Sequence, residues 1–262
     1  MPRFSANLSM LFAEQPFLDR FAAAAKAGFG GVEYLFPYTF DRPRLVDLLG
    51  ENQLTQVLFN LPAGDWAAGD RGIACMPERR NEFQDGVGLA LEFAAALNCR
   101  QLNCLAGIPT GVNPELARQT LVENLKFAAA ALARQNVRLL MEPLNTRDVP
   151  GFFVNRSRDA LAIMDDVGAP NLWLQFDIYH MQVMEGDLAT NIGKSIKRIS
   201  HFQIADNPGR HEPGTGEINF PFLFSFIDRL GYEGWIGCEY KPATTTEAGL
   251  RWMADVRAGS AA

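Results

Sequence analysis

Short apolar segments and longer amphipathic segments alternate along the whole chain. A segment such as residues 138–145 (RLLMEPLN) is apolar for a few residues and then ends in polar loop residues. This pattern is typical of a strand that is buried on both faces in a parallel sheet. Similar segments recur along the chain, so we predict strands at residues 3–8, 32–36, 55–60, 101–106, 138–143, 172–177, 198–204 and 235–239.

The amphipathic segments between these strands predict helices at residues 15–27, 42–51, 78–97, 114–135, 157–167, 188–195, 220–230 and 246–256. Gly28 is placed to end the first helix, and Ser157 to cap the fifth. Eight strand–helix pairs in 262 residues predict an α/β protein with a single domain, a (β/α)8 TIM barrel over residues 1–262. An open doubly wound sheet is less well supported, because no GxGxxG or Walker loop follows the first strand.

Four of the predicted strands carry an oxygen-bearing side chain near their C-terminal ends, namely Glu142, Asp177, Gln203 and Glu239. The strands of a parallel barrel all end on one face, so these residues converge although they are distant in sequence. Three carboxylates would repel one another and could not all stay ionised without a cation. Any one of them alone is typical of an acid that caps a helix or pairs with Arg. Together, three carboxylates and an amide oxygen favour a site for Mg²⁺ or Mn²⁺.

Residues near the strand ends are further candidates for binding a substrate. The loop at residues 61–72 is longer than a strand–helix connection needs, so we interpret it as functional. His180 is placed to contact a substrate oxygen or to orient a ligand. Candidate cations for an anionic substrate are Arg71, Arg210, His211 and Lys241, and candidate pocket walls are Phe36, Trp66 and Tyr179. Glu33, in the second strand, is either a supporting acid or the partner of a Lys or Arg.

The composition restricts the range of partners. With 48% hydrophobic and 21% charged residues the chain is an ordinary globular protein, and a net charge of −6 argues against a nucleic-acid partner. No apolar segment approaches the ~20 residues of a membrane span, and the N-terminus lacks the apolar core of a signal peptide. The four cysteines form no CxxC pair and are expected to be reduced, buried thiols. We expect a cytoplasmic protein with a small-molecule substrate and no membrane partner; a homo-oligomer stays open, because no residue pattern requires one.

Six segments of the chain resemble the hydroxypyruvate isomerase family. They are residues 60–69 (NLPAGDWAAG), 141–145 (MEPLN), 176–180 (FDIYH), 201–207 (HFQIADN), 212–219 (EPGTGEIN) and 237–242 (GCEYKP). The resemblance covers essentially the whole chain. The chain is thus also similar to the wider group of xylose isomerase-like TIM barrels, which includes ketose 3-epimerases, inosose dehydratases and apurinic-site endonucleases.

The resemblance implies that Glu142, Asp177, Gln203 and Glu239 bind a divalent metal, Mg²⁺ or Mn²⁺, and that Glu142 and Glu239 also transfer protons. The implied reaction interconverts hydroxypyruvate and 2-hydroxy-3-oxopropanoate (tartronate semialdehyde), which are small oxo and hydroxy acids. Moving the carbonyl from C2 to C3 requires that a proton leaves C3 and another returns to C2, through an enediolate. A divalent ion acidifies the C–H bond, and two carboxyl groups act as base and acid.

The same residues also bear on other activities. The 2-oxotetronate isomerases resemble the chain in the same segments and act on a substrate with one more carbon, so the pocket size near residues 60–71 decides between the two. The loop at 61–72 and residues 206–208 (DNP) resemble the hydroxypyruvate isomerases more. Ketose 3-epimerases usually carry His at the position of Gln203, which disfavours them. An apurinic-site endonuclease would need several His and a basic groove, whereas this chain has three His and a net charge of −6. A non-catalytic barrel is disfavoured by a set of metal-type ligands on four strands.

Overall fold

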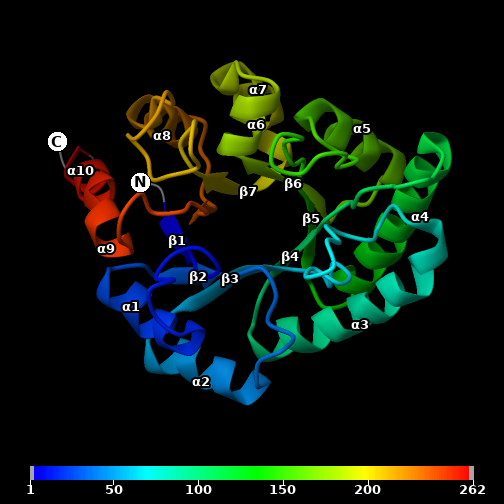
Figure 1. Cartoon of the computed structure of the whole chain (residues 1–262), viewed down its shortest axis with the longest axis horizontal. Helices are drawn as coiled ribbons and strands as arrows, with labels where there is room; N and C mark the ends of the chain where they lie inside the picture. Colours follow the sequence, from blue (N-terminus) through cyan, green and yellow to red (C-terminus); the bar gives the residue numbers. More distant parts are fainter. Residues whose placement is uncertain (1–2, 260–262) are drawn as a thin grey trace.

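The computed structural model describes the backbone of residues 3–259 and the side chains of residues 3–256. Its strands are β1 (Arg3–Asn7), β2 (Gly31–Glu33), β3 (Thr55–Asn60), β4 (Gln101–Cys104), β5 (Arg138–Met141), β6 (Leu172–Asp177), β7 (Ile199–Ile204) and β8 (Trp235–Cys238). They form a closed parallel barrel in which each strand pairs with the next and β8 pairs with β1 (Figure 1). The predicted (β/α)8 architecture is therefore confirmed.

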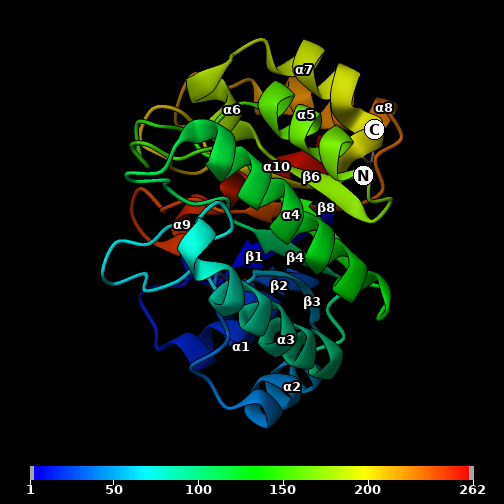
Figure 2. The same ribbon diagram turned by 90° about the vertical axis from the view of Figure 1, so that its right-hand side faces the viewer.

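Helices surround this barrel as an outer ring (Figures 1 and 2). They are η1 (Phe17–Asp19), α1 (Arg20–Lys26), α2 (Arg42–Glu51), η2 (Pro77–Arg79), α3 (Arg80–Ala96), α4 (Pro114–Ala133), α5 (Ser157–Val167), α6 (Ile178–Met184), α7 (Leu188–Ser195), η3 (Ile196–Arg198), α8 (Phe220–Arg229), α9 (Thr246–Gly249) and α10 (Arg251–Gly259). Within residues 3–259, no helix is both long enough and apolar enough to cross a membrane.

Most predicted elements are present, and the exceptions have local causes. Helix α6 was not predicted, because it begins directly after β6 with no loop residues between the strand and the helix. The prediction that Ser157 caps α5 is wrong, since Ser157 is the first helical residue and Arg156 precedes it without a side-chain cap. Gly28 does follow the end of α1, and its φ of +86° is a conformation that glycine adopts without strain.

The main apolar core lies between the strands and the surrounding helices, and it includes the four cysteines, which are free and buried as expected. The inside of the barrel is different, because many of its buried side chains are polar. These residues are Ser5, Asn7, Glu33, Gln101, Asn103, Gln175, His201 and Gln203. Bulky branched apolar residues usually fill a barrel of this kind. Here a network of hydrogen bonds fills it instead and lies next to the strand ends that carry the acids.

Candidate active site

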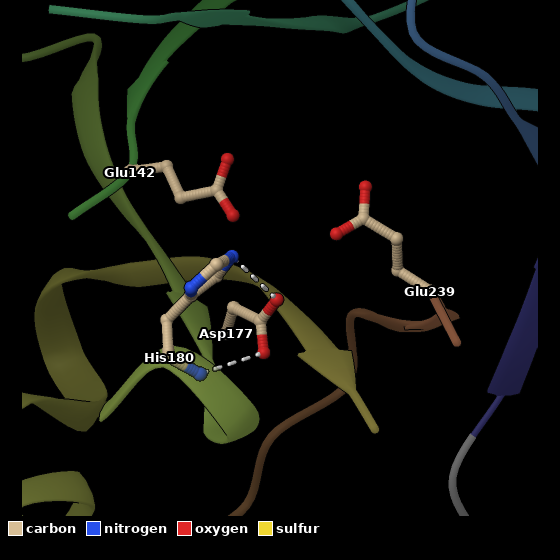
Figure 3. A group of neighbouring side chains, drawn as sticks. All are labelled: Glu142, Asp177, His180 and Glu239. Carbon is tan, nitrogen blue, oxygen red and sulfur yellow. Dashed lines mark hydrogen bonds and ion pairs between the residues drawn. The ribbon is translucent and has the colours of Figure 1, made fainter. Parts of the chain in front are cut away.

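Three carboxylates and a histidine converge at the C-terminal ends of the strands. Glu142 follows β5, Asp177 ends β6, Glu239 follows β8, and His180 lies in α6. Each offers one atom to a cluster in which all of these atoms lie within 4.8 Å of one another, and all four residues are buried. Figure 3 shows Glu142 and Glu239 facing each other across the space next to Asp177 and His180. The predicted convergence of these three acids is present in the structure.

The two carboxylate oxygens of Asp177 have different tasks. Oδ1 accepts hydrogen bonds from the backbone N–H groups of Tyr179 (2.8 Å) and His180 (3.4 Å), so Asp177 is the N-cap of α6. Oδ2 is buried and has no hydrogen-bond partner among the described residues. It lies 3.5 Å from Nε2 of His180 and 3.7 Å from Nη2 of Arg210. The cap therefore holds one oxygen and directs the other into the cluster.

The hydrogen bonds of His180 define the role of each ring nitrogen. The backbone N–H of Asn145 donates to Nδ1 (3.1 Å), so Nδ1 must be an acceptor. Burial, together with the nearby Arg210, holds the pKa of His180 well below its usual range, so the ring is neutral. The proton of the neutral ring is then on Nε2, which faces Asp177. His180 therefore presents a hydrogen-bond donor to the cluster and not a free lone pair for a metal.

Burial also raises the pKa of all three acids above their ordinary values. For Glu142 the nearby Glu239 and Asp177 add to this effect. Asp177 reaches a pKa of about 6 and Glu239 a pKa of about 8, although Arg210 opposes the rise for both. The guanidinium of Arg210 donates to Oε2 of Glu239 (2.5 Å). One arginine thus offsets only part of the repulsion among three buried carboxylates.

The cluster has the properties of a cation site. Oε1 of Glu142 and Oδ2 of Asp177 are buried oxygens without a hydrogen-bond partner among the described residues. Buried acceptors without partners are costly, so such oxygens usually face a ligand, an ion or water. Oxygen donors of this kind suit a hard divalent ion such as Mg²⁺ or Mn²⁺. The residues therefore fit the divalent metal that the sequence predicts.

The fourth predicted ligand, Gln203, is part of the polar network inside the barrel. Its Nε2 donates to Oε1 of Glu33 (2.7 Å), and its Oε1 accepts from Nε2 of Gln175 (2.6 Å). Gln203 is buried and is not among the described residues that line the cavity above the acids. Its carbonyl oxygen still has a second lone pair, so coordination of a metal by Gln203 stays a prediction.

The described hydrogen-bond partners of Glu33 include neither a Lys nor an Arg, so the prediction that Glu33 pairs with one of them is wrong. Its carboxylate accepts from Ser5, Asn7, His201 and Gln203. Burial opposes the ionisation of Glu33, but the attraction to His201 and the hydrogen bonds outweigh it. The pKa of Glu33 is therefore below its usual value.

Glu142 and Glu239 open into a cavity of about 480 Å³. Its lining includes all four predicted substrate-binding residues, which are His180, Arg71, Arg210 and Lys241. The aromatic residues Trp66 and Tyr179 also line it, whereas Phe36 packs behind Trp66 with ring centroids 5.1 Å apart. The guanidinium of Arg71 lies 4.2 Å from the centre of the Trp66 ring, within the loop predicted to be functional. His211 instead contacts the backbone oxygen of Lys241 through Nδ1 (2.7 Å).

Several site residues were not predicted. Asn103 donates to Oε2 of Glu142 (2.9 Å), and Asn7 donates to Oε1 of Glu239 (3.1 Å). Arg147 and Asp148 line the cavity from the connection after β5. The length of that connection was a usable signal, because it is longer than most strand–helix loops. The two asparagines gave no such signal, because an amide within a strand is not distinctive.

Comparison with known proteins shows which proteins this chain resembles over nearly its whole length. A sequence model described as "Xylose isomerase-like TIM barrel" matches residues 21–256. A protein named hydroxypyruvate isomerase from Escherichia coli is 56% identical over 97% of this chain and 98% of its own length. A protein named 2-oxo-tetronate isomerase from Cupriavidus necator is 52% identical, with the same coverage. A solved structure titled AP endonuclease, family 2, from Brucella melitensis is 50% identical, with a TM-score of 0.96 over 97% of this chain and 99% of that one.

Proposed function

The chain belongs to the xylose isomerase-like TIM-barrel family, and we propose that it is an isomerase that interconverts hydroxypyruvate and 2-hydroxy-3-oxopropanoate. The observation that carries this proposal is the pair Glu142 and Glu239. The two side chains face one cavity from different strands, and burial has raised the pKa of both. A carboxylate with a raised pKa is a better base, and its protonated form is available at neutral pH.

The proposed metal ligands are Glu142, Asp177, Gln203 and Glu239, with Mg²⁺ or Mn²⁺ as the ion. When bound, a divalent ion would polarise the substrate carbonyl and acidify the adjacent C–H bond. The support in this chain is the pair of buried oxygens on Glu142 and Asp177 that have no hydrogen-bond partner among the described residues. The family named above supports the choice of ligands as well.

The chain's own residues account for the proton transfers. One of Glu142 and Glu239 takes a proton from C3 of hydroxypyruvate, and the other returns a proton to C2. The hydroxyl proton on the C3 oxygen moves to the C2 oxygen, which leaves the aldehyde at C3. General acid and base groups of this kind each contribute roughly 10²–10⁴-fold to a rate.

Further residues bind and orient the substrate in this proposal. The Nε2–H of His180 donates to a substrate oxygen near Asp177. Arg71, Arg210 and Lys241 line the cavity and attract the substrate carboxylate. Tyr179 supports this wall, because the guanidinium of Arg210 lies 5.2 Å from the centre of its ring.

A second candidate is 2-oxotetronate isomerisation, which uses the same chemistry on a substrate with one more carbon. A relative named 2-oxo-tetronate isomerase that is 52% identical supports this candidate, and the cavity of about 480 Å³ has room for either acid. Hydroxypyruvate remains the first choice, because the loop at 61–72 and residues 206–208 resemble hydroxypyruvate isomerases more than 2-oxotetronate isomerases. The 3-epimerase alternative is weaker, because Gln203 stands where those enzymes usually have His.

Turnover of metal-stripped protein tests both candidates directly. Hydroxypyruvate and 2-oxotetronate are supplied side by side, with and without Mg²⁺ or Mn²⁺, and the semialdehyde product is followed with a coupled reductase. Glu142→Gln protein, purified in the same way, controls for contaminating isomerases. We expect metal-dependent conversion with hydroxypyruvate preferred. Preference for the four-carbon acid would select the second candidate, and no turnover of either acid would refute the proposal.

A further inference from the structure

The carboxylate of Glu33 lies inside the barrel, next to the proposed metal ligands. It is 1% exposed and receives hydrogen bonds from two other strands of the barrel, β1 and β7. Oε2 accepts from Oγ of Ser5 (2.8 Å) and is 2.8 Å from Nε2 of His201. Oε1 accepts from Nε2 of Gln203 (2.7 Å) and Nδ2 of Asn7 (3.3 Å). All four partners come from β1 or β7, so this one carboxylate links β2 to two other strands.

The carboxylate of Glu33 occupies the space that a side chain at Gly237 would fill. A Cβ atom placed on Gly237 would lie 2.3 Å from Oε1 of Glu33 and 2.4 Å from Oε2. Any side chain at 237 would therefore displace the carboxylate. Gly237 is in β8, two residues before Glu239. A glycine at this point is explained by the room that Glu33 needs.

Glu33 determines which way the Gln203 amide points. A carboxylate accepts hydrogen bonds and cannot donate them, so it must face the NH₂ group of the amide. The carbonyl oxygen of Gln203 is therefore turned away from Glu33. Gln175 donates to this oxygen (2.6 Å), but the Gln175 amide has donors at one end and an acceptor at the other and can turn with Gln203, so Glu33 is the partner that fixes the orientation. An amide coordinates a hard metal only through its oxygen, so the orientation matters for the proposed ligand.

Glu33 also reaches Glu239 through one intervening residue. Nδ2 of Asn7 donates both to Glu33 and to Oε1 of Glu239 (3.1 Å). The other end of the Asn7 amide is fixed too, because its Oδ1 accepts from the backbone N–H of Ser9 (3.0 Å). Two of the four proposed ligands, Gln203 and Glu239, are thus connected to the carboxylate of Glu33, the first directly and the second through Asn7.

We propose that Glu33 is a positioning residue of the metal site, which fixes Gln203 directly and Glu239 through Asn7. The proposal rests on the metal site of the proposed function. Partners of this kind behind a metal ligand typically change metal affinity by about 10- to 100-fold when they are removed.

Direct Mn²⁺ binding tests this proposal without any measurement of turnover. Free Mn²⁺ is measured by electron paramagnetic resonance during titration of the metal-stripped protein, and thermal unfolding is recorded for each variant. Glu33→Met removes all acceptors at similar size, and we expect its Mn²⁺ dissociation constant to rise by about 10- to 100-fold. Glu33→Gln keeps an oxygen for Gln203 and Asn7, while the hydroxyl of Ser5 can accept from its NH₂. We expect its affinity to stay within about threefold of the wild-type value.

Two further variants complete the test. Gln101→Met is the matched control, because Gln101 is buried in the same network and contacts Ser200 and His201 but none of the proposed ligands. It should lower the unfolding temperature and leave Mn²⁺ affinity unchanged. If Glu33→Met does not fold, Glu33→Asp keeps the charge but is too short for both sets of partners, and should weaken Mn²⁺ binding about tenfold.

The possible outcomes are distinct. Wild-type affinity in Glu33→Met or Glu33→Asp would overturn the proposal. An equal loss in Glu33→Gln and Glu33→Met would also overturn it, because the charge of Glu33 would then matter and not the positions of its partners. Absence of Mn²⁺ binding in the wild-type protein would instead refute the metal site of the proposed function.

Discussion

Replacing Glu239 by glutamine should stabilise the metal-free protein at alkaline pH, although it should abolish turnover. Glutamine resembles the protonated form of glutamate in size and charge. Burial raises the pKa of Glu239 from 4.5 to about 8, against the attraction of Arg210. The folded protein therefore binds this proton more tightly than the unfolded chain does. Stability is lost as the pH rises from 4.5 through 8, and the glutamine variant does not suffer this loss.

The size of the effect follows from the pKa values. One pKa unit corresponds to ~1.4 kcal/mol, so complete ionisation of Glu239 costs the folded state about 5 kcal/mol. Glu142 and Asp177 titrate together with Glu239, which spreads this cost over the group. We therefore expect Glu239→Gln to be more stable than the wild-type protein by about 2–4 kcal/mol at pH 8.5, and by less than about 1 kcal/mol at pH 5.

Urea unfolding in the presence of a chelator measures this difference at the two pH values. Glu78→Gln is a suitable control, because Glu78 is exposed and its replacement should change stability by less than about 0.5 kcal/mol at either pH. Saturating Mn²⁺ should reverse the order, because the ion stabilises only a protein that binds it. The reasoning would be refuted if Glu239→Gln were less stable than the wild type at pH 8.5, or if the difference did not change with pH.

Three further predictions concern the cavity. Glu142→Gln should lower turnover at least about 100-fold without unfolding the protein, as checked by kinetics and circular dichroism; a fully active variant would exclude the acid–base role. His180→Gln should lower kcat about 10- to 100-fold but leave the Mn²⁺ dissociation constant unchanged, because Nε2 is a donor; lost Mn²⁺ affinity would make His180 a ligand. Lys241→Met should raise KM for hydroxypyruvate about tenfold with little change in kcat, since a cation at the cavity wall attracts the substrate; an unchanged KM would place the carboxylate elsewhere.

The sequence predicts the barrel and the acids well, for one physical reason. Apolar runs mark strands that are buried on both faces, and the residue after each run is at the strand end. Glu142, Asp177 and Glu239 can therefore be placed on one face before any distance is known. Arg71, Arg210 and Lys241 do line the cavity, but His211, in the same loop as Arg210, does not, so a place beyond a strand end does not by itself decide which cations face the cavity.

The contacts across the barrel could not be predicted in this way. The partners of Glu33 lie on β1 and β7, and the register between strands decides which side chains meet. Register depends on the tilt of all eight strands together and has no local signature. For the same reason Gln203 could be assigned to a strand end, but its hydrogen bonds to Glu33 and Gln175 could not.

Asp177 shows that two interpretations of a strand-end acid need not exclude each other. An acid at this place can cap a helix, or it can serve a site. In this protein α6 starts immediately after β6, so the oxygen that caps the helix and the oxygen that faces the cluster belong to one carboxylate. The cap restricts the rotation of the side chain and so keeps Oδ2 directed at Glu142 and Glu239. Helix formation therefore does part of the positioning of the site, and the nearby His180 and Arg210, at 3.5 and 3.7 Å from Oδ2, add to it.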